Sequence, residues 1–371
     1  MTTIERIRVS AVAFGSDEYS WSALMPSMLN TDTVVRIDTS DGLQGWGAVC
    51  SCVEHDIDLS IAHGTKPLLP GLLGRDATDL DGIWEWMSWR KPYVTNPSIA
   101  AIDIALWDLA ARRAAEPLHT HLGATADRLP AYASIPVLEN PQANIELIER
   151  LAEDGFTVFK FHYKSVPEPD IELIRVIHEM FAPRGFRFMF DAECAYDLDQ
   201  ATAVGRAAAD ADFVWLEAPL PDRSLADYAE LRRRVDVDVL PAGLTVADEQ
   251  DLANSLTADP WSRVRTDAAA CGGITPLRRI AALAERHGLR TELQSWGSSL
   301  STIANLQASL ALPATDWFEV PVPRIDFDVP GVERIDVDGT GAAVAPSGSG
   351  LGLAVDWDEF DARSQLLFDV S

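Results

Sequence analysis

Two carboxylates each end a short apolar stretch of the sequence, where a buried charge needs a partner. Asp191 follows the apolar residues 188–190, and Glu217 follows the apolar residues 214–216. A charge that ends a hydrophobic strand is costly to bury unless it is paired or coordinated. Oxygen ligands from neighbouring strands suit Mg²⁺, which prefers hard donors and keeps some of its waters. The alternative is that each carboxylate pairs with an arginine or caps a helix.

Chemically informative positions recur along the chain at about one strand-and-helix interval. They are 31, 26, 27, 23 and 27 residues apart in the series Lys160, Asp191, Glu217, Leu244, Asp267 and Gln294. Short apolar segments alternate with helical stretches over this region, which predicts parallel strands joined by helices. The predicted strands are residues 132–135, 158–162, 186–191, 213–217, 237–242, 264–267, 289–294 and 317–320. Eight such repeats close a barrel whose active site lies at the C-terminal ends of its strands.

The first part of the chain has a different pattern. Residues 33–47 alternate around a Ser-Asp-Gly turn, which predicts a small antiparallel sheet. Apolar residues at helical spacing predict a helix over residues 98–115. The fold class is therefore predicted as α/β, a (β/α)7-8 TIM-type barrel with an N-terminal α+β capping domain. We place the capping domain at 1–128, completed by residues from about 328 to 371, and the catalytic barrel at 129–327.

Composition narrows the classes of partner and the location. The chain of 371 residues has a formal net charge of -27, which would repel nucleic acid and anionic membranes. Its four cysteines, the absence of a secretory leader and the absence of an apolar run of transmembrane length favour a reducing cytoplasm. We therefore expect a cytoplasmic protein with no nucleic-acid or membrane partner.

Motifs in both parts of the chain resemble the enolase superfamily, in its mandelate racemase-like branch. Residues 39–47 resemble the sheet return of the family, and residues 101–110 resemble its hallmark helix. The likeness continues in the barrel and the tail at residues 159–162, 191–193, 215–219, 271–275 and 350–352. The resemblance implies proton abstraction α to a carboxylate, with Mg²⁺ held by three acidic side chains. A carbon acid is so weak that the charge of its enediolate must be met by a cation already in place.

The metal ligands implied by the resemblance are incomplete in this chain. The first two fall on Asp191 and Glu217, but the third falls on Leu244, which cannot coordinate a cation. Glu193 is the candidate substitute, because alternation with Asp191 could bring both side chains towards the opening. A solvent or arginine partner for Glu193 is the alternative. Mg²⁺ is thus the predicted cofactor, with Asp191, Glu217 and Glu193 as its ligands.

The predicted catalytic groups lie on two sides of the barrel. The Lys-x-Lys pair of the family appears as Lys160 and His162, on the same face of a strand. His162 can take a proton near neutral pH, although a lone strand histidine is more often structural. Lys160 would contact the substrate carboxylate, or act as the base in place of His162.

On the opposite side the resemblance implies an Asp-His dyad. Asp267 matches the aspartate, whereas Gln294 replaces the histidine and can hydrogen-bond but cannot exchange protons. Gln294 could instead orient a substrate hydroxyl. Glu319 matches an acid on the eighth strand, which could hydrogen-bond the substrate carboxylate or pair with Arg324.

Three residues of the first part are predicted to bind substrate. Tyr19, Trp21 and Met25 fall in the segment that, by resemblance, folds over the barrel mouth and shapes specificity. Exposed aromatic residues in this segment could alternatively serve a subunit contact. The resemblance also implies a homo-oligomer and a small carboxylic acid as substrate.

The function predicted first is that of a hydro-lyase which dehydrates a sugar acid or another hydroxy acid. His162 or Lys160 would remove the α-proton, and Asp267 or Glu319 would assist departure of the β-hydroxyl. The runner-up is an isomerase, either a racemase or epimerase or a cycloisomerase. The third possibility is a ligand-binding relative that has lost efficient catalysis, which Leu244 and Gln294 motivate.

Overall fold

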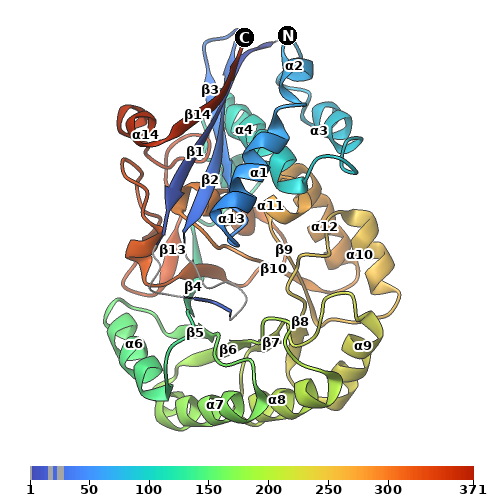
Figure 1. Cartoon of the computed structure of the whole chain (residues 1–371), viewed down its shortest axis with the longest axis vertical. Coiled ribbons are helices and arrows are strands. Elements are labelled where there is room, and N and C mark those ends of the chain that lie inside the picture. The colour runs from blue at the N-terminus through green and yellow to red at the C-terminus, as the bar shows by residue number, and fades with distance from the viewer. Residues whose placement is uncertain (1, 16–19, 23–28) are drawn as a thin grey trace.

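The structure is a computed structural model in which a cap sits above a barrel (Figure 1). It describes residues 2–15, 20–22 and 29–371. Both termini lie at the end of the cap that is farthest from the barrel. The cap sheet has the order β14-β1-β2-β3, with strands at Gln365–Val370, Ile4–Phe14, Asn30–Thr39 and Gln44–Val49. Its helices are α1 (His55–Thr65), α2 (Leu69–Leu72), α3 (Leu80–Ser88), α4 (Asn96–Ala114) and α5 (Leu118–His121).

The barrel contains a strand at each of the eight predicted positions. The strands are β4 (Arg128–Ile135), β5 (Val158–Phe161), β6 (Arg187–Asp191), β7 (Trp215–Glu217), β8 (Asp238–Leu240), β9 (Arg263–Thr266), β10 (Arg290–Leu293) and β11 (Phe318–Pro321). The helices between them are α6 (Pro141–Glu153), α7 (Pro167–Phe181), α8 (Leu198–Asp210), α9 (Leu225–Arg234), α10 (Glu249–Leu256), α11 (Ala268–Cys271), α12 (Ile274–Arg286) and α13 (Ser299–Ala311). The predicted fold class is therefore confirmed.

Register in the barrel places the two strand-end carboxylates side by side. Strands β11, β4, β5, β6, β7 and β8 form one parallel ladder, and β9 pairs with β10. Between β8 and β9 the N–H of Ser262 donates to the carbonyl of Val239 at 2.9 Å. Asp191 pairs with Glu217 across β6 and β7. Adjacent parallel strands bring such residues to the same end of the barrel, as the spacing predicts.

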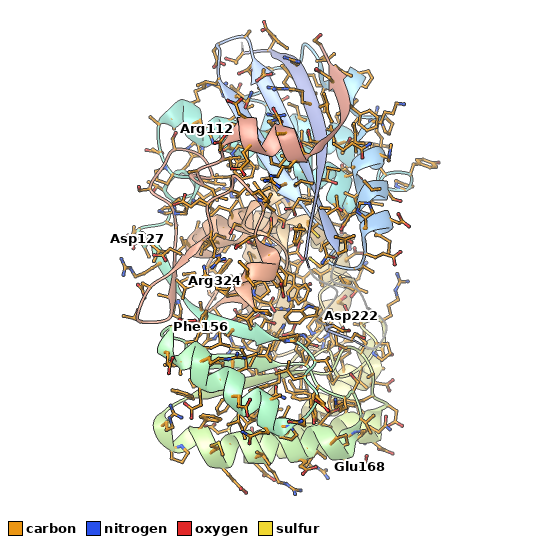
Figure 2. The ribbon with its side chains drawn as sticks, turned by 60° about the vertical axis from the view of Figure 1, so that its left-hand side comes forward. Arg112, Asp127, Phe156, Glu168, Asp222 and Arg324 are labelled. Carbon is orange, nitrogen blue, oxygen red and sulfur yellow. The ribbon has the colours of Figure 1, made fainter. Side chains whose placement is uncertain are left out.

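The C-terminal tail contacts both parts of the molecule. Strand β14 joins the cap sheet beside β1, whereas β13 (Ala342–Val344) pairs with β4 of the barrel and with β12 (Asp336–Val337). Helix α14 (Trp357–Arg363) precedes β14. In Figure 2, Arg112 lies in the cap and Glu168 at the opposite end of the molecule. The domain boundaries at 128 and 328 stay a prediction.

Helix α4 joins the cap to the barrel and to the C-terminal tail through two buried aspartates. Asp103 accepts hydrogen bonds from the backbone N–H and the hydroxyl of Thr275, at 3.0 and 2.7 Å. Asp108 accepts from the backbone of Trp46 in β3 and of Leu351 in the tail, at 2.9 and 2.6 Å. Each buried carboxyl group is thus hydrogen-bonded, as burial of a polar group requires. The motifs that carry the family resemblance in the cap, on the barrel and in the tail meet on this helix.

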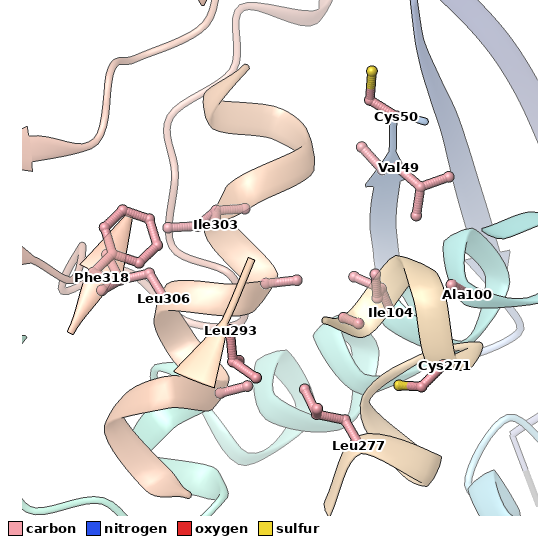
Figure 3. Close-up of a cluster of buried hydrophobic side chains, with 14 of the residues drawn as sticks. Val49, Cys50, Ala100, Ile104, Cys271, Leu277, Leu293, Ile303, Leu306 and Phe318 are labelled. Atoms are coloured by element: carbon pink, nitrogen blue, oxygen red, sulfur yellow. The ribbon is translucent and has the colours of Figure 1, made fainter. Parts of the chain in front are cut away.

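Apolar packing continues the same junction. A Cβ on Gly47 would lie 2.5 Å from the carbonyl oxygen of Ala101, so only glycine lets β3 approach α4 this closely. Figure 3 shows the cluster, in which Val49 and Ile104 of the cap share a buried core with Leu293 and Ile303 of the barrel. Each Å² of apolar surface that is buried here stabilises the contact between cap and barrel by about 25 cal/mol. The cap is therefore held over the strand ends. Among the described residues, no helix is long and apolar enough to cross a membrane.

Candidate active site

A buried lysine lies at the centre of the C-terminal end of the barrel. Lys160 is 2% exposed, and its Nζ lies 3.2 Å from Asp191 Oδ2, 3.1 Å from Glu217 Oε1 and 2.7 Å from Glu319 Oε1. The structure thus brings four predicted site residues together. The two strand-end carboxylates that were predicted to hold a cation both contact this ammonium group.

A second buried cation, Arg265 of β9, was absent from the predicted site. Its side chain is fully buried, with Nε 2.7 Å from Glu217 Oε1 and Nη2 2.9 Å from Glu319 Oε2. Glu319 therefore pairs with Lys160 and Arg265, and not with Arg324 as one alternative had it. The sequence did hold a signal: Arg265 and Asp267 are two residues apart, so alternation places Arg265 on the same face of the strand, one layer deeper.

The charge states in this cluster follow from the opposed ions. Burial alone would raise the pKa of Glu319, but Lys160 and Arg265 outweigh it and hold the pKa at about 2. Burial alone would lower the pKa of Lys160, but Glu217 and Glu319 raise it well above its usual value. Near neutral pH, Lys160 is therefore an ammonium and Glu319 a carboxylate. A protonated lysine cannot act as a base, and an ionised glutamate has no proton to donate.

His162 faces the pocket, and the hydrogen-bond partner of one ring nitrogen shows where a ring hydrogen lies. Nδ1 lies 2.8 Å from the carbonyl oxygen of Ile135. Since a carbonyl oxygen only accepts, Nδ1 carries the hydrogen. Nε2 lies 3.3 Å from Asp191 Oδ2 and 3.5 Å from Glu193 Oε1. Burial opposes a charged ring, yet the Asp191 carboxylate raises the pKa of His162 above its ordinary value.

The loop after β8 explains the exposed leucine at the third ligand position. The buried carboxylate of Asp222, labelled in Figure 2, accepts the N–H groups of Ala242, Gly243 and Leu244 at 2.6, 3.1 and 3.2 Å. Gly243 has φ +90, a conformation that favours glycine. This turn ties the backbone to Asp222 and leaves the Leu244 side chain 71% exposed at the pocket.

The opposite wall carries a single titratable group near neutrality. Asp267 caps α11 by accepting the N–H of Ala270 at 2.8 Å. Burial raises the pKa of Asp267 to about 6. Gln294 and Trp296 line both this side and the pocket that holds Lys160 and His162, so the two spaces adjoin.

The cap closes the pocket from above with an indole. Trp21 packs edge-on against His162, with ring centroids 5.0 Å apart, and against Trp296. The N–H of Val137 donates to the carbonyl of Ser20 at 2.7 Å, which ties this cap segment to the barrel. Tyr19 and Met25, the other predicted substrate contacts, lie outside the described residues.

The metal ligands implied by the resemblance do not fit a cation in this arrangement. Oε1 of Glu217 contacts Lys160 and Arg265, and Oε2 accepts from Trp215 Nε1 at 3.1 Å. Leu244 offers no oxygen. A different group does fit: within the part of the chain that the structure describes, three ligand atoms lie within 4.8 Å of one another only in His162, Asp191 and Glu193.

Comparison with known proteins agrees with the fold. Residues 143–359 match the family model described as enolase C-terminal domain-like. Residues 23–123 match the mandelate racemase / muconate lactonizing enzyme N-terminal domain. A solved structure from Pseudovibrio sp., of the mandelate racemase/muconate lactonizing enzyme group, has 30% identity and a TM-score of 0.94, covering 100% of this chain and 98% of that one.

The named relatives have several activities. The L-Lys-D/L-Arg epimerase of Methylococcus capsulatus is 31% identical over 77% of this chain and 81% of its own. The 3,6-anhydro-alpha-L-galactonate cycloisomerase of Streptomyces coelicolor is 29% identical over the same shares. The L-talarate/galactarate dehydratase of Salmonella typhimurium is 27% identical over 77% and 72%. A racemase structure from Streptomyces coelicolor with bound magnesium has 26% identity and a TM-score of 0.85, over 97% and 99% of the chains. This chain belongs to the enolase superfamily, in its mandelate racemase/muconate lactonizing enzyme group.

Proposed function

We propose that this protein is a hydro-lyase that removes the proton α to the carboxylate of a small hydroxy acid and expels the β-hydroxyl as water. One observation carries this proposal: Asp267, with a pKa of about 6, lies across the adjoining pocket from a wall of paired charges. A base works best when its pKa lies near the operating pH. Relatives that include an L-talarate/galactarate dehydratase support the class of reaction and a sugar-acid substrate.

The charged wall supports binding in preference to proton transfer, although burial raises the pKa of Glu193 on this wall to about 7. Lys160 is held as an ammonium by three carboxylates. The Nε2 atom of His162 faces the oxygens of Asp191 and Glu193, so its position suits a ligand or a proton donor better than a base. We therefore assign the base to Asp267, whereas the sequence favoured His162 or Lys160. The carboxylate end of the substrate would lie towards Lys160 and His162.

A single carboxyl group can serve both halves of a dehydration. Asp267 would take the α-proton as a carboxylate and return it to the departing β-hydroxyl as an acid, on one face of the substrate. The neighbouring Gln294 amide can hold a hydroxyl group through a hydrogen bond. The solved racemase structure from Streptomyces coelicolor contains magnesium, and a bound cation would supply charge stabilisation for the enediolate.

The same geometry bears on the isomerase alternative. Racemisation by two bases needs a second proton-exchanging group opposite Asp267, on the wall where Lys160 is held as an ammonium group by its acidic partners. A cycloisomerase needs only one such group, so lactone formation is the isomerase reaction that the site supports. The named cycloisomerase among the relatives agrees with this second candidate.

The test is a product screen against a library of acid sugars and smaller hydroxy acids. Dehydration yields a 2-keto acid, which a carbonyl-trapping reagent detects. We expect a product from at least one member, with the activity lost in Asp267→Asn. Solvent deuterium in the substrate α-position without keto acid would favour the isomerase. Neither product nor deuterium across the library would refute both reactions.

A further inference from the structure

We propose that His162, Asp191 and Glu193 form a site for a divalent first-row transition ion, displaced from the Mg²⁺ position that the family resemblance implies. His162 follows the end of β5, Asp191 is the last residue of β6, and Glu193 lies two residues after it. All three line the pocket. In this site His162 takes the place of Glu217 in the predicted ligand set. The ligand atoms are then one nitrogen and two oxygens, where the prediction had only oxygens.

The spacing of the three ligand atoms suits a metal ion. Nε2 of His162 lies 3.3 Å from Asp191 Oδ2 and 3.5 Å from Glu193 Oε1. With metal-ligand distances of about 2.1 Å, neighbouring ligands lie about 3.0 Å apart in an octahedron and about 3.4 Å apart in a tetrahedron. The two measured distances are close to these values. The Nζ of Lys160 also lies 3.2 Å from Asp191 Oδ2, so the ion would share this oxygen with Lys160.

The second coordination shell of the histidine is already formed. The Nδ1–H group donates to the Ile135 carbonyl at 2.8 Å, which directs the Nε2 lone pair of the neutral ring towards the two carboxylates. Ligating histidines in metalloproteins are fixed in this way, with the other ring N–H bonded to a carbonyl or carboxylate. A metal ion bound at Nε2 would take the place of the proton that the Asp191 carboxylate favours on this ring.

The backbone after β6 brings Glu193 to this position. Strand β6 ends at Asp191, and Glu193 and Cys194 both have positive φ, at 55 and 59. For residues other than glycine, each such conformation costs on the order of 1 kcal/mol and persists where the surroundings hold it. The N–H groups of Ala192 and Cys194 donate to the carbonyls of Glu217 and Ala218, at 3.0 and 2.7 Å, and hold the turn.

Acidic side chains outnumber basic ones on this wall. Asp191, Glu193, Glu217 and Glu319 face Lys160 and Arg265, either directly or through His162. A divalent ion would add positive charge beside these acidic side chains. An anionic substrate could then approach this wall, a step that rests on the proposed function.

The ligand types favour a transition ion over Mg²⁺. Imidazole suits zinc, iron, nickel and copper, whereas Mg²⁺ prefers oxygen ligands and waters. Because first-row affinities generally rise towards the end of the series, we expect Zn²⁺ to bind more tightly than Mn²⁺, and both more tightly than Mg²⁺.

The experiment measures metal binding by the full chain without a tag, after removal of metal with a chelator and without substrate. Calorimetry with Zn²⁺, Mn²⁺ and Mg²⁺ should give one Zn²⁺ site that binds more than about 100-fold tighter than Mg²⁺. Loss of an outer-shell partner weakens metal binding by about 10- to 100-fold, so loss of a ligand in His162→Asn or Glu193→Gln should exceed that. Asp267→Asn, on the opposite wall, should keep the wild-type affinity within about twofold, since it touches neither coordination shell.

A Co²⁺ spectrum separates the proposed site from alternatives. Visible d–d bands should appear on stoichiometric Co²⁺ addition and vanish in His162→Asn. Circular dichroism and a melting curve establish that each variant is folded. The proposal is overturned by absence of stoichiometric binding, by unchanged binding in folded His162→Asn, or by Mg²⁺ binding that matches Zn²⁺ and requires Glu217. Because no substrate is present, these outcomes are independent of the keto-acid screen.

Discussion

The two sides of the barrel mouth differ in how their charges are arranged. Strands β5, β6, β7, β9 and β11 supply one side, where Lys160 and Arg265 together contact Glu217 and Glu319. The loops after β8, β9 and β10 supply the other, where Leu244, Asp267 and Gln294 line the adjoining pocket. On the first side, opposed ions fix the protonation states of Lys160 and Glu319, although burial raises the pKa of Glu193 to about 7. On the second side, burial raises the pKa of Asp267 to about 6. Charge density at a strand end therefore does not by itself identify the group that transfers protons.

The largest effect, on the free energy of unfolding, should follow from removing the guanidinium group of Arg265. This group lies on the side of the barrel mouth with the buried ion pairs, here called the paired side. Arg265→Met leaves Glu217 and Glu319 short of a buried partner, and breaking a buried ion pair costs about 3–5 kcal/mol. Urea unfolding should show this loss in the free energy of unfolding. As a matched control, Arg233→Ala removes a 68% exposed arginine from its pair with Glu230 and should cost less than about 1 kcal/mol. Equal costs for the two variants would mean that the buried pair contributes no more than a surface pair.

The next largest effect should be on activity, after substitution of Asp267 on the other side of the barrel mouth. Asp267→Asn removes the proton-transferring group, and general acid–base catalysis contributes about 10²- to 10⁴-fold, so kcat should fall by that factor. Asparagine caps helices about as well as aspartate, and the cap on Ala270 should keep thermal stability close to that of the wild type. Asp267→Ala lacks the cap and should lose about 1 kcal/mol of stability besides the activity. Retained activity in a folded Asp267→Asn variant would return the base to the paired side.

The pH dependence should follow the same residue. The base must be ionised to accept the α-proton, and burial raises the pKa of Asp267 to about 6. The value of kcat/KM should therefore rise about tenfold per pH unit below 6 and level off above it. Because the raised pKa favours the protonated form, acidification removes activity. A rate that rises only through pH 4, where an unperturbed aspartate titrates, would contradict the role of burial.

Local pattern was enough to predict the barrel, but only part of the site. Alternation and spacing located all eight strands, and strand register then placed Lys160, Asp191 and Glu217 together. Arg265 was not predicted because only residues at or just after the end of each strand were considered. Arg265 lies two residues before Asp267, deeper in the barrel. Its partners come from β7 and β11, so the pairing depends on contacts distant in sequence.

The loops show a second limit of prediction from sequence. Alternation predicted that Glu193 and Asp191 would both lie towards the opening, and both line the pocket. However, β6 ends at Asp191, and a left-handed turn, not strand alternation, brings Glu193 to this position. Asp222 shapes the loop around Leu244 from 22 residues away. No local pattern marks such a contact. The roles of the predicted site residues stay predictions until binding and activity are measured.

The smallest effect should come from restoring the missing family ligand. Leu244→Glu places a carboxylate where the resemblance implies the third Mg²⁺ ligand, but the oxygens of Glu217 remain engaged by Lys160, Arg265 and Trp215. Because an added ligand helps only if the other two are free, we expect Mg²⁺ affinity to change less than about twofold and stability by less than about 0.5 kcal/mol. Calorimetry with Mg²⁺ measures the first and urea unfolding the second. A tight Mg²⁺ site in Leu244→Glu would show that a metal ion can replace Lys160 and Arg265 as the partner of Glu217. The difference between the two sides of the mouth would then depend on position 244 alone.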